Sequence, residues 1–242
     1  TATISASGPL AFCEPNNVVL TASAGSSWLW SNGATTQAIT ISSPAASGAY
    51  TVRVTNSNGC FATSSATTVT VSARPTVSLS AAPYTKLFPG LTTTLTGAVT
   101  PYGSYTYTWM NNGSILNGAT AATIPVTINE LGSYTLTATN SGGCTNISNA
   151  VVIGDSVTAK LFIMPNPNDG QFQVSYYSTA NSSFTMNVVD ARGAVVYSKF
   201  YSIGAPYQRM DVDIRKHNAG IYTIVLVDKN GKRIVAGNVL IN

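Results

Sequence analysis

Two stretches of this chain repeat each other, and the repeat limits the possible folds more than any other feature. Residues 48–60 match residues 132–144, from a shared Gly-x-Tyr through an Asn-Ser-x-Gly-Cys ending, 84 positions apart. Upstream, a tryptophan is followed closely by an Asn-Gly turn at Trp30 and again at Trp109. Self-similarity over a period of this size indicates two copies of one folded unit.

Within each copy, apolar and polar residues alternate along short runs. Alternation with a period of two, bounded by Asn-Gly and Ser-Gly turns, predicts half-buried strands at the spacing of a β-sandwich. A tryptophan on a central strand followed by a Gly-x-Tyr resembles the immunoglobulin-like modules of large bacterial surface proteins. The alternating apolar residues are Trp28, Trp30, Ile39, Ile41, Tyr50, Val52 and Val54 in the first copy, and Tyr105, Tyr107, Trp109, Ile124, Val126, Ile128, Tyr134, Leu136 and Ala138 in the second.

Composition supports an extracellular all-β protein. Only 8% of the residues are charged, against roughly a quarter in an average globular domain, while 44% are hydrophobic. The formal net charge of +4 is uneven: residues 1–157 hold three basic and three acidic residues, and residues 158–242 hold nine and five. The basic residues are scattered through predicted turns, so a solvated surface is expected and nucleic-acid binding is not.

Three cysteines are present, and Cys13 and Cys60 are the only pair inside one copy of the repeat. A secreted context permits disulfides, so a Cys13–Cys60 bridge is expected, and it would stabilise the first unit by about 4 kcal/mol in the chain-entropy estimate. Aligning the copies places Phe88 at the position of Cys13, which leaves Cys144 as an odd thiol.

The alternative is three separate thiols. In immunoglobulin topology the strand after Cys13 and the strand before Cys60 run in the same direction. The two cysteines would then lie at opposite ends of the unit, farther apart than the about 7 Å that a disulfide allows between Cα atoms. No paired Cys/His spacing is present, so no metal site is expected.

The last third of the chain carries a series of turn motifs followed by a terminal apolar strand. The residues of these motifs are Pro165, Asn166, Pro167, Gly170, Asp190, Gly193, Gly220, Tyr222, Gly231, Lys232, Val239, Leu240 and Ile241. Their order and spacing resemble the type A C-terminal sorting domain of the type IX secretion system of Bacteroidota.

The resemblance implies a route and a set of partners. Such a domain is recognised in the periplasm and crosses the outer membrane through the type IX translocon, and its final strand is expected to engage the outer-membrane shuttle barrel. A sortase-like peptidase then usually removes it, and the protein is attached to the cell surface or released. Many members carry a lysine before the last strand, whereas this chain has Ala236-Gly237-Asn238 there. Lys232 and Arg233 are a hypothetical substitute for that charge.

The same segment also has a direct physical interpretation. One-sided strands are predicted over residues 172–176 and 184–188. Two hairpin turns are predicted where Gly193 and Gly231 supply positive φ, and an entry corner at the Pro-Asn-Pro run. Together these elements predict a compact sandwich of about seven strands.

The expected fold is therefore all-β, with three consecutive β-sandwich domains. Residues 1–73 and 74–155 are expected to be immunoglobulin-like, and residues 156–242 the seven-stranded sorting domain. No run of about 18 apolar residues occurs, so no membrane span is expected. The chain begins at Thr1 without a leader, so we expect a processed or excised C-terminal portion of a longer protein.

Few residues suggest catalysis. His217 lies in a polar run that predicts a solvated loop, and the close pair Asp211 and Asp213 is expected to have a surface role. No Gly-x-Ser-x-Gly elbow and no phosphate-binding glycine loop occurs, so neither enzymatic activity nor a cofactor is expected within these residues. Asp155-Ser156-Val157 resembles the short O-glycosylation motif of Bacteroidota, with a plain accessible linker as the alternative.

Three functions fit these features. The first is a secreted or cell-surface protein whose modules act as spacers or adhesive surfaces for a protein or glycan ligand. The second is the tail of an exported hydrolase or peptidase with its catalytic domain upstream. The third is a carbohydrate-binding module in which Trp28, Tyr102 or Tyr105 forms a stacking platform, although core packing is the alternative role of these aromatics.

Overall fold

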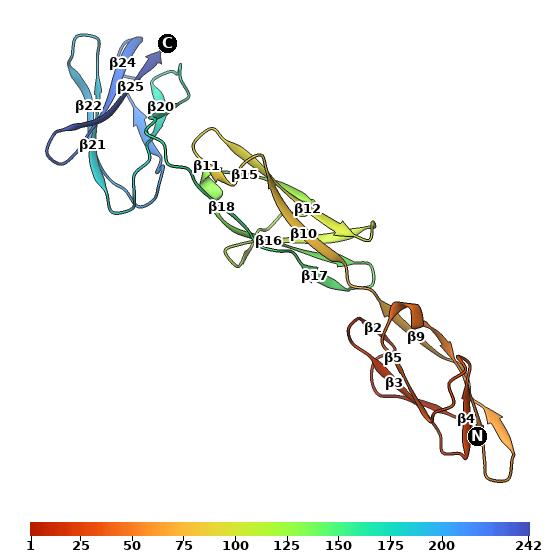
Figure 1. The fold of residues 1–242 in the computed structure, drawn as a ribbon. Helices are drawn as coiled ribbons and strands as arrows, with labels where there is room; N and C mark the ends of the chain where they lie inside the picture. The colour runs from red at the N-terminus through yellow and green to blue at the C-terminus, as the bar shows by residue number, and fades with distance from the viewer. The chain divides into compact units, whose positions relative to one another are not determined.

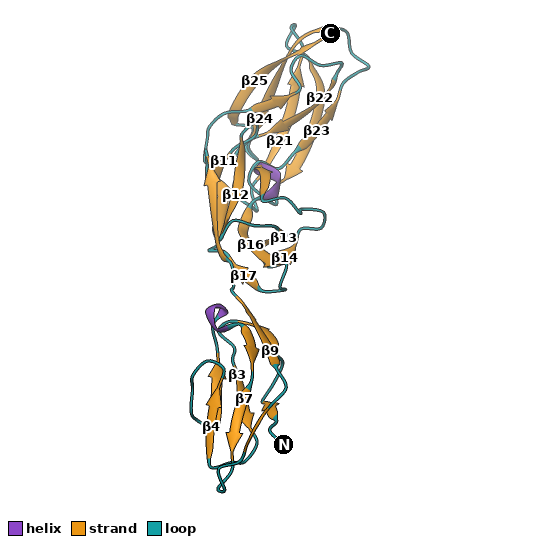
Figure 2. Cartoon of the chain, turned by 90° about the vertical axis from the view of Figure 1, so that its right-hand side faces the viewer, coloured by secondary structure: helices purple, strands orange, loops and turns teal.

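The computed structural model describes all 242 residues, and nearly all regular structure in it is β. Twenty-five strands are accompanied only by two short 3-10 turns, η1 (Pro44–Ala46) and η2 (Ile128–Glu130), which are purple in Figure 2. The strands form three groups along the chain, β1–β9, β10–β18 and β19–β25, and no sheet contains strands of two groups. The expectation of an all-β chain of consecutive β-sandwiches is confirmed.

The contacts between Cα atoms divide the chain into two compact units. Unit 1 comprises residues 1–80, 96–122 and 134–151, and unit 2 comprises residues 81–95, 123–133 and 152–242. This division passes through the middle group of strands and does not follow the expected borders at residues 73 and 155. The borders of the three domains therefore remain a prediction.

The first sandwich lies wholly in unit 1, and its strands can be followed in Figure 1. Its sheets have the strand orders β1-β3-β5, β2-β9-β6 and β4-β7-β8. Strand β2 runs parallel to the last strand, β9, with Cys13 beside Ser72. Strands β3 and β5 are antiparallel, and so are β4 and β7. The strands are β1 (Ile4–Ala6), β2 (Ala11–Cys13), β3 (Val18–Ala22), β4 (Ser27–Trp30), β5 (Ala38–Ile41), β6 (Gly48–Tyr50), β7 (Val52–Thr55), β8 (Phe61–Thr63) and β9 (Thr67–Ser72).

The core of this sandwich contains the alternating residues that the sequence pattern selects. Trp30 is buried, and its indole Nε1–H donates to the carbonyl of Thr36 at 2.8 Å. Tyr50 is also buried, and its hydroxyl donates to the carbonyl of Ala46 four residues upstream. This bond is the tyrosine corner of immunoglobulin-like domains.

The second copy of the repeat reproduces these features. In unit 1, Trp109 is fully buried opposite Leu136, and its indole Nε1–H donates to the carbonyl of Ala121 at 2.8 Å. In unit 2, β11 runs parallel to the end of β18, as β2 does to β9. The strands of this group are β10 (Thr76–Ala82), β11 (Lys86–Leu87), β12 (Thr92–Thr100), β13 (Tyr105–Asn111), β14 (Ser114–Ile115), β15 (Thr123–Thr127), β16 (Gly132–Asn140), β17 (Thr145–Ile147) and β18 (Val151–Asp155).

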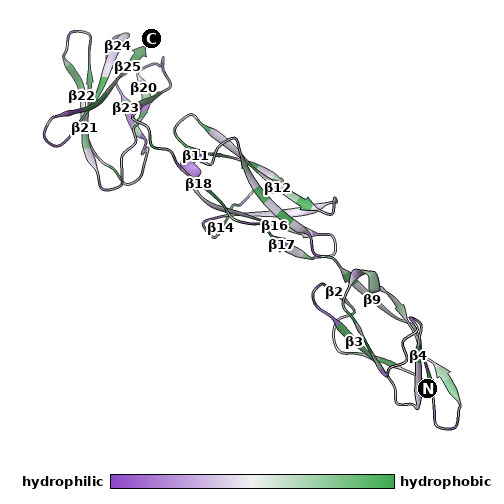
Figure 3. Ribbon diagram, in the orientation of Figure 1, coloured by the Kyte–Doolittle hydropathy of each residue, from purple (hydrophilic) through white to green (hydrophobic).

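The C-terminal sandwich lies wholly in unit 2 and has the seven strands expected. A four-stranded sheet, β22-β21-β24-β25, and a three-stranded sheet, β19-β20-β23, enclose an apolar core. Apolar residues, green in Figure 3, lie along the strands, and many loops are polar. The strands are β19 (Phe162–Met164), β20 (Gln171–Ser175), β21 (Ser183–Val189), β22 (Val195–Ser202), β23 (Met210–Asp213), β24 (Gly220–Val227) and β25 (Arg233–Ile241).

Candidate functional site

The terminal strand β25 lies at one edge of the four-stranded sheet. It pairs along its length with β24, with Tyr222 beside Val239. Val239 and Ile241 are buried in the core, whereas Leu240 between them is 40% exposed. The strand therefore contributes alternate side chains to the core and presents the others outward.

The other side of this strand is held by two asparagines of the Pro-Asn-Pro-Asn run. The Asn166 side-chain amide both donates and accepts a hydrogen bond. Its Nδ2 donates to the carbonyl of Asn238 at 3.0 Å, and its Oδ1 accepts from the backbone N–H of Leu240 at 2.9 Å. Asn168 forms a parallel bridge with Ile241, and its backbone N–H donates to the carbonyl of Leu240 at 3.1 Å. We call residues 165–170 the asparagine clamp. The clamp occupies edge groups that would otherwise be free to pair with another chain.

Internal bonds and a close backbone approach fix the shape of the clamp. The buried Asn168 side chain donates from Nδ2 to the carbonyl of Pro165 at 2.9 Å and accepts from the N–H of Gly170 at 2.8 Å. Gly170 has φ +96°, and a Cβ there would lie 2.9 Å from the backbone N and Cα of Arg215. Both the conformation and the space require glycine at this position.

The two predicted hairpin turns are present and have the same bonding. Asp190 accepts through Oδ1 from the N–H groups of Arg192 and Ala194, each at 2.9 Å. Asp228 does the same for Asn230 at 2.8 Å and Lys232 at 2.9 Å. The turn glycines have positive φ, 87° at Gly193 and 80° at Gly231. These side-chain bonds fix turns that join β21 to β22 and β24 to β25.

Gly220 and Tyr222 form a second tyrosine corner. The Tyr222 hydroxyl donates to the carbonyl of Asn218 at 2.6 Å, and the side chain is buried. Gly220 pairs with Ile241, the last residue of β25. The Gly-x-Tyr motif therefore sets the start of β24 beside the end of the terminal strand.

The basic residues near β25 lie at its beginning. Lys232 immediately precedes the strand and Arg233 is its first residue; both are exposed, and neither forms a salt bridge. Ala236-Gly237-Asn238 lies inside the strand, not before it. The hypothesis that the two basic residues replace the usual lysine remains a prediction.

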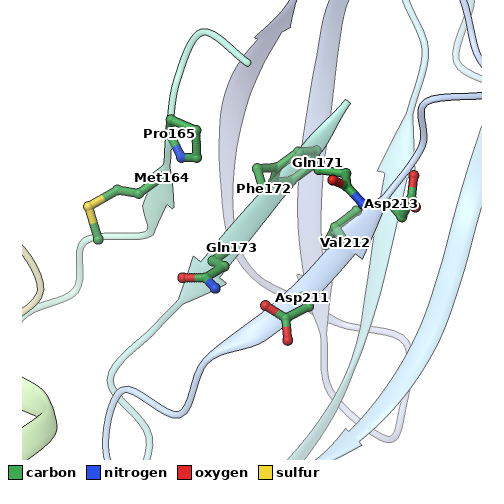
Figure 4. Close-up of a pocket in the computed structure, with 8 residues that line it drawn as sticks. All are labelled: Met164, Pro165, Gln171, Phe172, Gln173, Asp211, Val212 and Asp213. Atoms are coloured by element: carbon green, nitrogen blue, oxygen red, sulfur yellow. Dashed lines mark hydrogen bonds between the residues drawn. The ribbon is translucent and has the colours of Figure 1, made fainter. Parts of the chain in front are cut away.

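A shallow hollow on β20 and β23 contains the carboxylate pair that the sequence singled out (Figure 4). Arg215 donates to Asp213 with Nη2–Oδ2 at 2.7 Å, and Gln171 donates to the same oxygen at 3.2 Å. These bonds, above all those from Arg215, lower the pKa of Asp213 to about 2. An exposed ion pair with a depressed carboxyl pKa is the reverse of the raised pKa that a general acid needs at neutral pH.

The environment of His217 differs from the expectation. His217 is half-buried, and its Nε2 is screened from solvent without a hydrogen-bond partner, so the prediction of a solvated loop histidine is wrong.

The environment of Ser156 also differs from the expectation. Ser156 is half-buried, its N–H donates to the carbonyl of Leu87, and its own carbonyl accepts from the Tyr207 hydroxyl. These contacts hold the backbone at Ser156, which is less free than the expected linker; its glycosylation remains a prediction.

The predicted Cys13–Cys60 bridge is wrong. Cys13 is bonded to Cys144, with their Cα atoms 5.6 Å apart, and Cys60 is a free, exposed thiol. Cys13 ends β2, whereas Cys60 follows β7 in the turn before β8, and the directions of the strands place them at opposite ends of the first sandwich. Cys144 is therefore not the odd thiol. The alignment of the two copies places Cys60 and Cys144 in equivalent loops, but it carries no signal that Cys144 bonds the preceding copy.

The three aromatics considered for glycan stacking do not form one platform. The Trp28 indole donates to Ser23 and the Tyr105 hydroxyl donates to Pro101, and both side chains are partly buried. Tyr102 alone is fully exposed. No group of three or more His, Cys, Asp and Glu residues is placed to hold a metal, and no helix is long and apolar enough to cross a membrane.

Comparisons with solved structures give several distant likenesses. Murine CEACAM1b is 18% identical, with 63% of this chain and 98% of that chain covered and a TM-score of 0.39. Three N-terminal domains of the bacteriophage RB49 highly immunogenic outer capsid protein are 10% identical, with 99% and 96% covered and a TM-score of 0.32. A three-immunoglobulin structure of titin is 11% identical, with 100% and 98% covered and a TM-score of 0.34. No curated protein gives a significant match.

The family comparison concerns the C-terminal sandwich. Residues 162–238 match the model of the secretion system C-terminal sorting domain. The match begins at the first strand of this sandwich and includes the asparagine clamp, both aspartate turns and the Gly-x-Tyr corner. Residues 162–238 are therefore a type IX secretion C-terminal sorting domain, which marks the chain as part of a secreted or cell-surface protein.

Proposed function

We propose that the terminal strand and the asparagine clamp together form the element that the type IX machinery recognises. The observation that carries this proposal is that an edge strand, β25, is covered on its outer side by only two asparagine residues. An edge strand is a natural docking point, because its backbone groups can pair with a strand of another protein. The outer-membrane shuttle barrel is the proposed partner at this edge, and a sortase-like peptidase is the proposed partner after export.

The upstream sandwiches are proposed to be noncatalytic spacers that can also present an adhesive surface. Their fold supports this role, since Trp30 and Trp109 are used in their cores and the carboxylates of the chain are dispersed. In this proposal, any catalytic activity of a longer protein would belong to a domain outside these residues. The ligand class of an adhesive surface is a protein or a glycan.

Secretion of a reporter tests the proposal. A fluorescent protein joined ahead of residues 1–242 is expressed in a type IX-competent host and in a strain that lacks the translocon. We expect the reporter in the medium or on the cell surface only in the competent host. Periplasmic retention in both strains would refute a functional sorting signal.

A pair of variants then tests the clamp. Asn166→Ala removes both side-chain bonds to β25, whereas Asn56→Ala removes equivalent side-chain bonds in a turn of the first sandwich. We expect Asn166→Ala to lower secretion at least tenfold and Asn56→Ala to lower it less than twofold. Circular dichroism should show that both proteins are folded. Equal secretion of the two folded variants would contradict recognition through the clamped strand.

A further inference from the structure

Two loops of the repeat have the same internal bonding. In residues 56–60, the Asn56 N–H donates to the carbonyl of Cys60 at 2.9 Å, and Asn56 Oδ1 accepts from the Cys60 N–H at 3.0 Å. In residues 140–144, the corresponding bonds between Asn140 and Cys144 measure 3.0 and 2.9 Å. The glycine before each cysteine has positive φ, 80° and 76°. The two loops therefore hold their cysteines in the same way.

In unit 1, the second loop closes on the end of the first sandwich. Cys144 is 1% exposed and bonded to Cys13, and Asn140 Nδ2 donates to the carbonyl of Ala73 at 2.9 Å. The fit is close, because a Cβ on Gly142 would come within 2.7 Å of the Ser72 hydroxyl oxygen. The loop cysteine of one module thus bonds the module that precedes it in the chain.

The first loop has the same bonding, but its cysteine has no disulfide partner. Cys60 is exposed and unbonded, and Phe61 beside it is 61% exposed, with the Arg53 guanidinium carbon 3.8 Å from the centre of its ring. A free, exposed thiol is unusual at the surface of an exported protein. In the second loop, the equivalent cysteine forms a disulfide with a cysteine of the preceding module.

We propose that Cys60 forms a disulfide with an immunoglobulin-like module of the same kind, joined directly ahead of Thr1. The partner cysteine is the counterpart of Cys13, at the end of a strand that runs parallel to the last strand of that module. Cys60 would then repeat the bond between Cys144 and Cys13, and successive immunoglobulin-like modules would be linked covalently.

The opposite end of the series supports this direction of bonding. Phe88 stands at the position of Cys13 in the second copy, and in unit 2 its ring stacks on Phe162 of the next sandwich, with centroids 5.4 Å apart. The same position thus contacts the following module in both copies, through a disulfide in one and an aromatic pair in the other. The series of cysteines ends where the sorting domain begins.

Bond formation is a two-electron oxidation. The two thiols lose two protons and two electrons, and one S–S bond forms. The electrons pass to the disulfide of a thiol oxidoreductase of the exporting compartment, or to oxidised glutathione in vitro, whose S–S bond is reduced to two thiols.

The test adds one module to the full chain. Residues 1–75 are placed directly ahead of Thr1, because Leu20 and Leu95 correspond across the repeat and Thr1 then follows Pro75 as Thr76 does. The extended protein is refolded with a glutathione redox buffer, its free thiols are blocked with iodoacetamide, and its disulfides are mapped by mass spectrometry without reduction.

We expect two bonds: Cys13 to Cys144 as before, and Cys13 of the added copy to Cys60 of the original first module. Only Cys60 of the added copy should carry the alkyl group. Cys60→Ser in the original module should leave Cys13 of the added copy alkylated without disturbing the other bond. The proposal is overturned if Cys60 of the original module is alkylated while Cys13–Cys144 is intact, or if it bonds another molecule instead.

Discussion

The first sandwich, β1–β9, and the C-terminal sandwich, β19–β25, share their local construction but differ in how the last strand is held. Both have a tyrosine corner, at Tyr50 and Tyr222, and both have hairpin turns closed by an Asn or Asp side chain. In the first, the last strand β9 has a strand on each side. In the C-terminal sandwich, β25 has a strand on one side and the asparagine clamp on the other.

This difference separates structural residues from residues that can carry a signal. The Gly-x-Tyr motif and the Asx-x-x-Gly turns serve the same structural purpose in a sandwich that is no sorting domain. They are needed to build the C-terminal fold, but they do not distinguish it. The asparagine clamp on β25 has no counterpart in the first sandwich, and together with that strand it is the proposed signal.

The largest expected effect is on the unfolding free energy, when residues on the buried and exposed faces of β25 are replaced. Val239→Asp places an unpaired carboxylate at a site that is 1% exposed, and we expect a loss of about 4 kcal/mol or more in the unfolding free energy of the C-terminal sandwich. Leu240→Asp, at a site 40% exposed, should cost about 1 kcal/mol or less. Urea unfolding of the full chain, followed by near-UV circular dichroism, measures both. Equal losses would mean that the register of β25 is wrong.

The next effect compares two glycines with positive φ. Gly170→Ala meets backbone atoms of Arg215 as well as an unfavourable φ, and we expect a loss of about 3 kcal/mol. Gly193→Ala has open space around its Cβ, so only the conformational cost of about 1 kcal/mol should appear. Thermal unfolding of the two variants measures this difference. Similar melting temperatures would contradict the close approach of the clamp to Arg215.

The shared corners predict matched effects in the two sandwiches. Tyr50→Phe and Tyr222→Phe each remove one hydrogen bond to a carbonyl four residues upstream, and each should cost about 1 kcal/mol. Urea denaturation with a separate spectroscopic probe in each sandwich can assign each loss. A loss confined to Tyr222→Phe would show that the corner has a special role in the sorting domain.

Local features were predictable from the sequence, and contacts between distant segments were not. Period-two alternation predicted the strands, and a glycine three residues after an aspartate predicted the turns at Gly193 and Gly231, because both depend on a few neighbouring residues. The prolines of the clamp predicted a corner. Pairing of Asn166 with backbone 72 residues away depends on tertiary structure, as does the bond between Cys13 and Cys144.

The smallest effect concerns an ion pair of the C-terminal sandwich, because the first sandwich has no salt bridge. Bonds from Arg215 lower the pKa of Asp213 to about 2, below the ordinary aspartate value of about 3.9. Because the folded-state pKa is depressed, the contribution of this pair to stability is present above pH 4 and is lost as the pH falls towards 2. Exposure of both partners makes that contribution small.

Carboxyl chemical shifts followed by NMR from pH 5 to pH 1.5 measure this titration directly. Arg215→Gln should return the Asp213 midpoint towards the ordinary value, while Lys232→Gln, at an exposed cation without an ion pair, should leave it unchanged. A midpoint near pH 4 in the unsubstituted protein would show that the Asp213–Arg215 pair does not persist in solution. That ion pair would then not separate the two sandwiches, whereas the clamp on β25 still would.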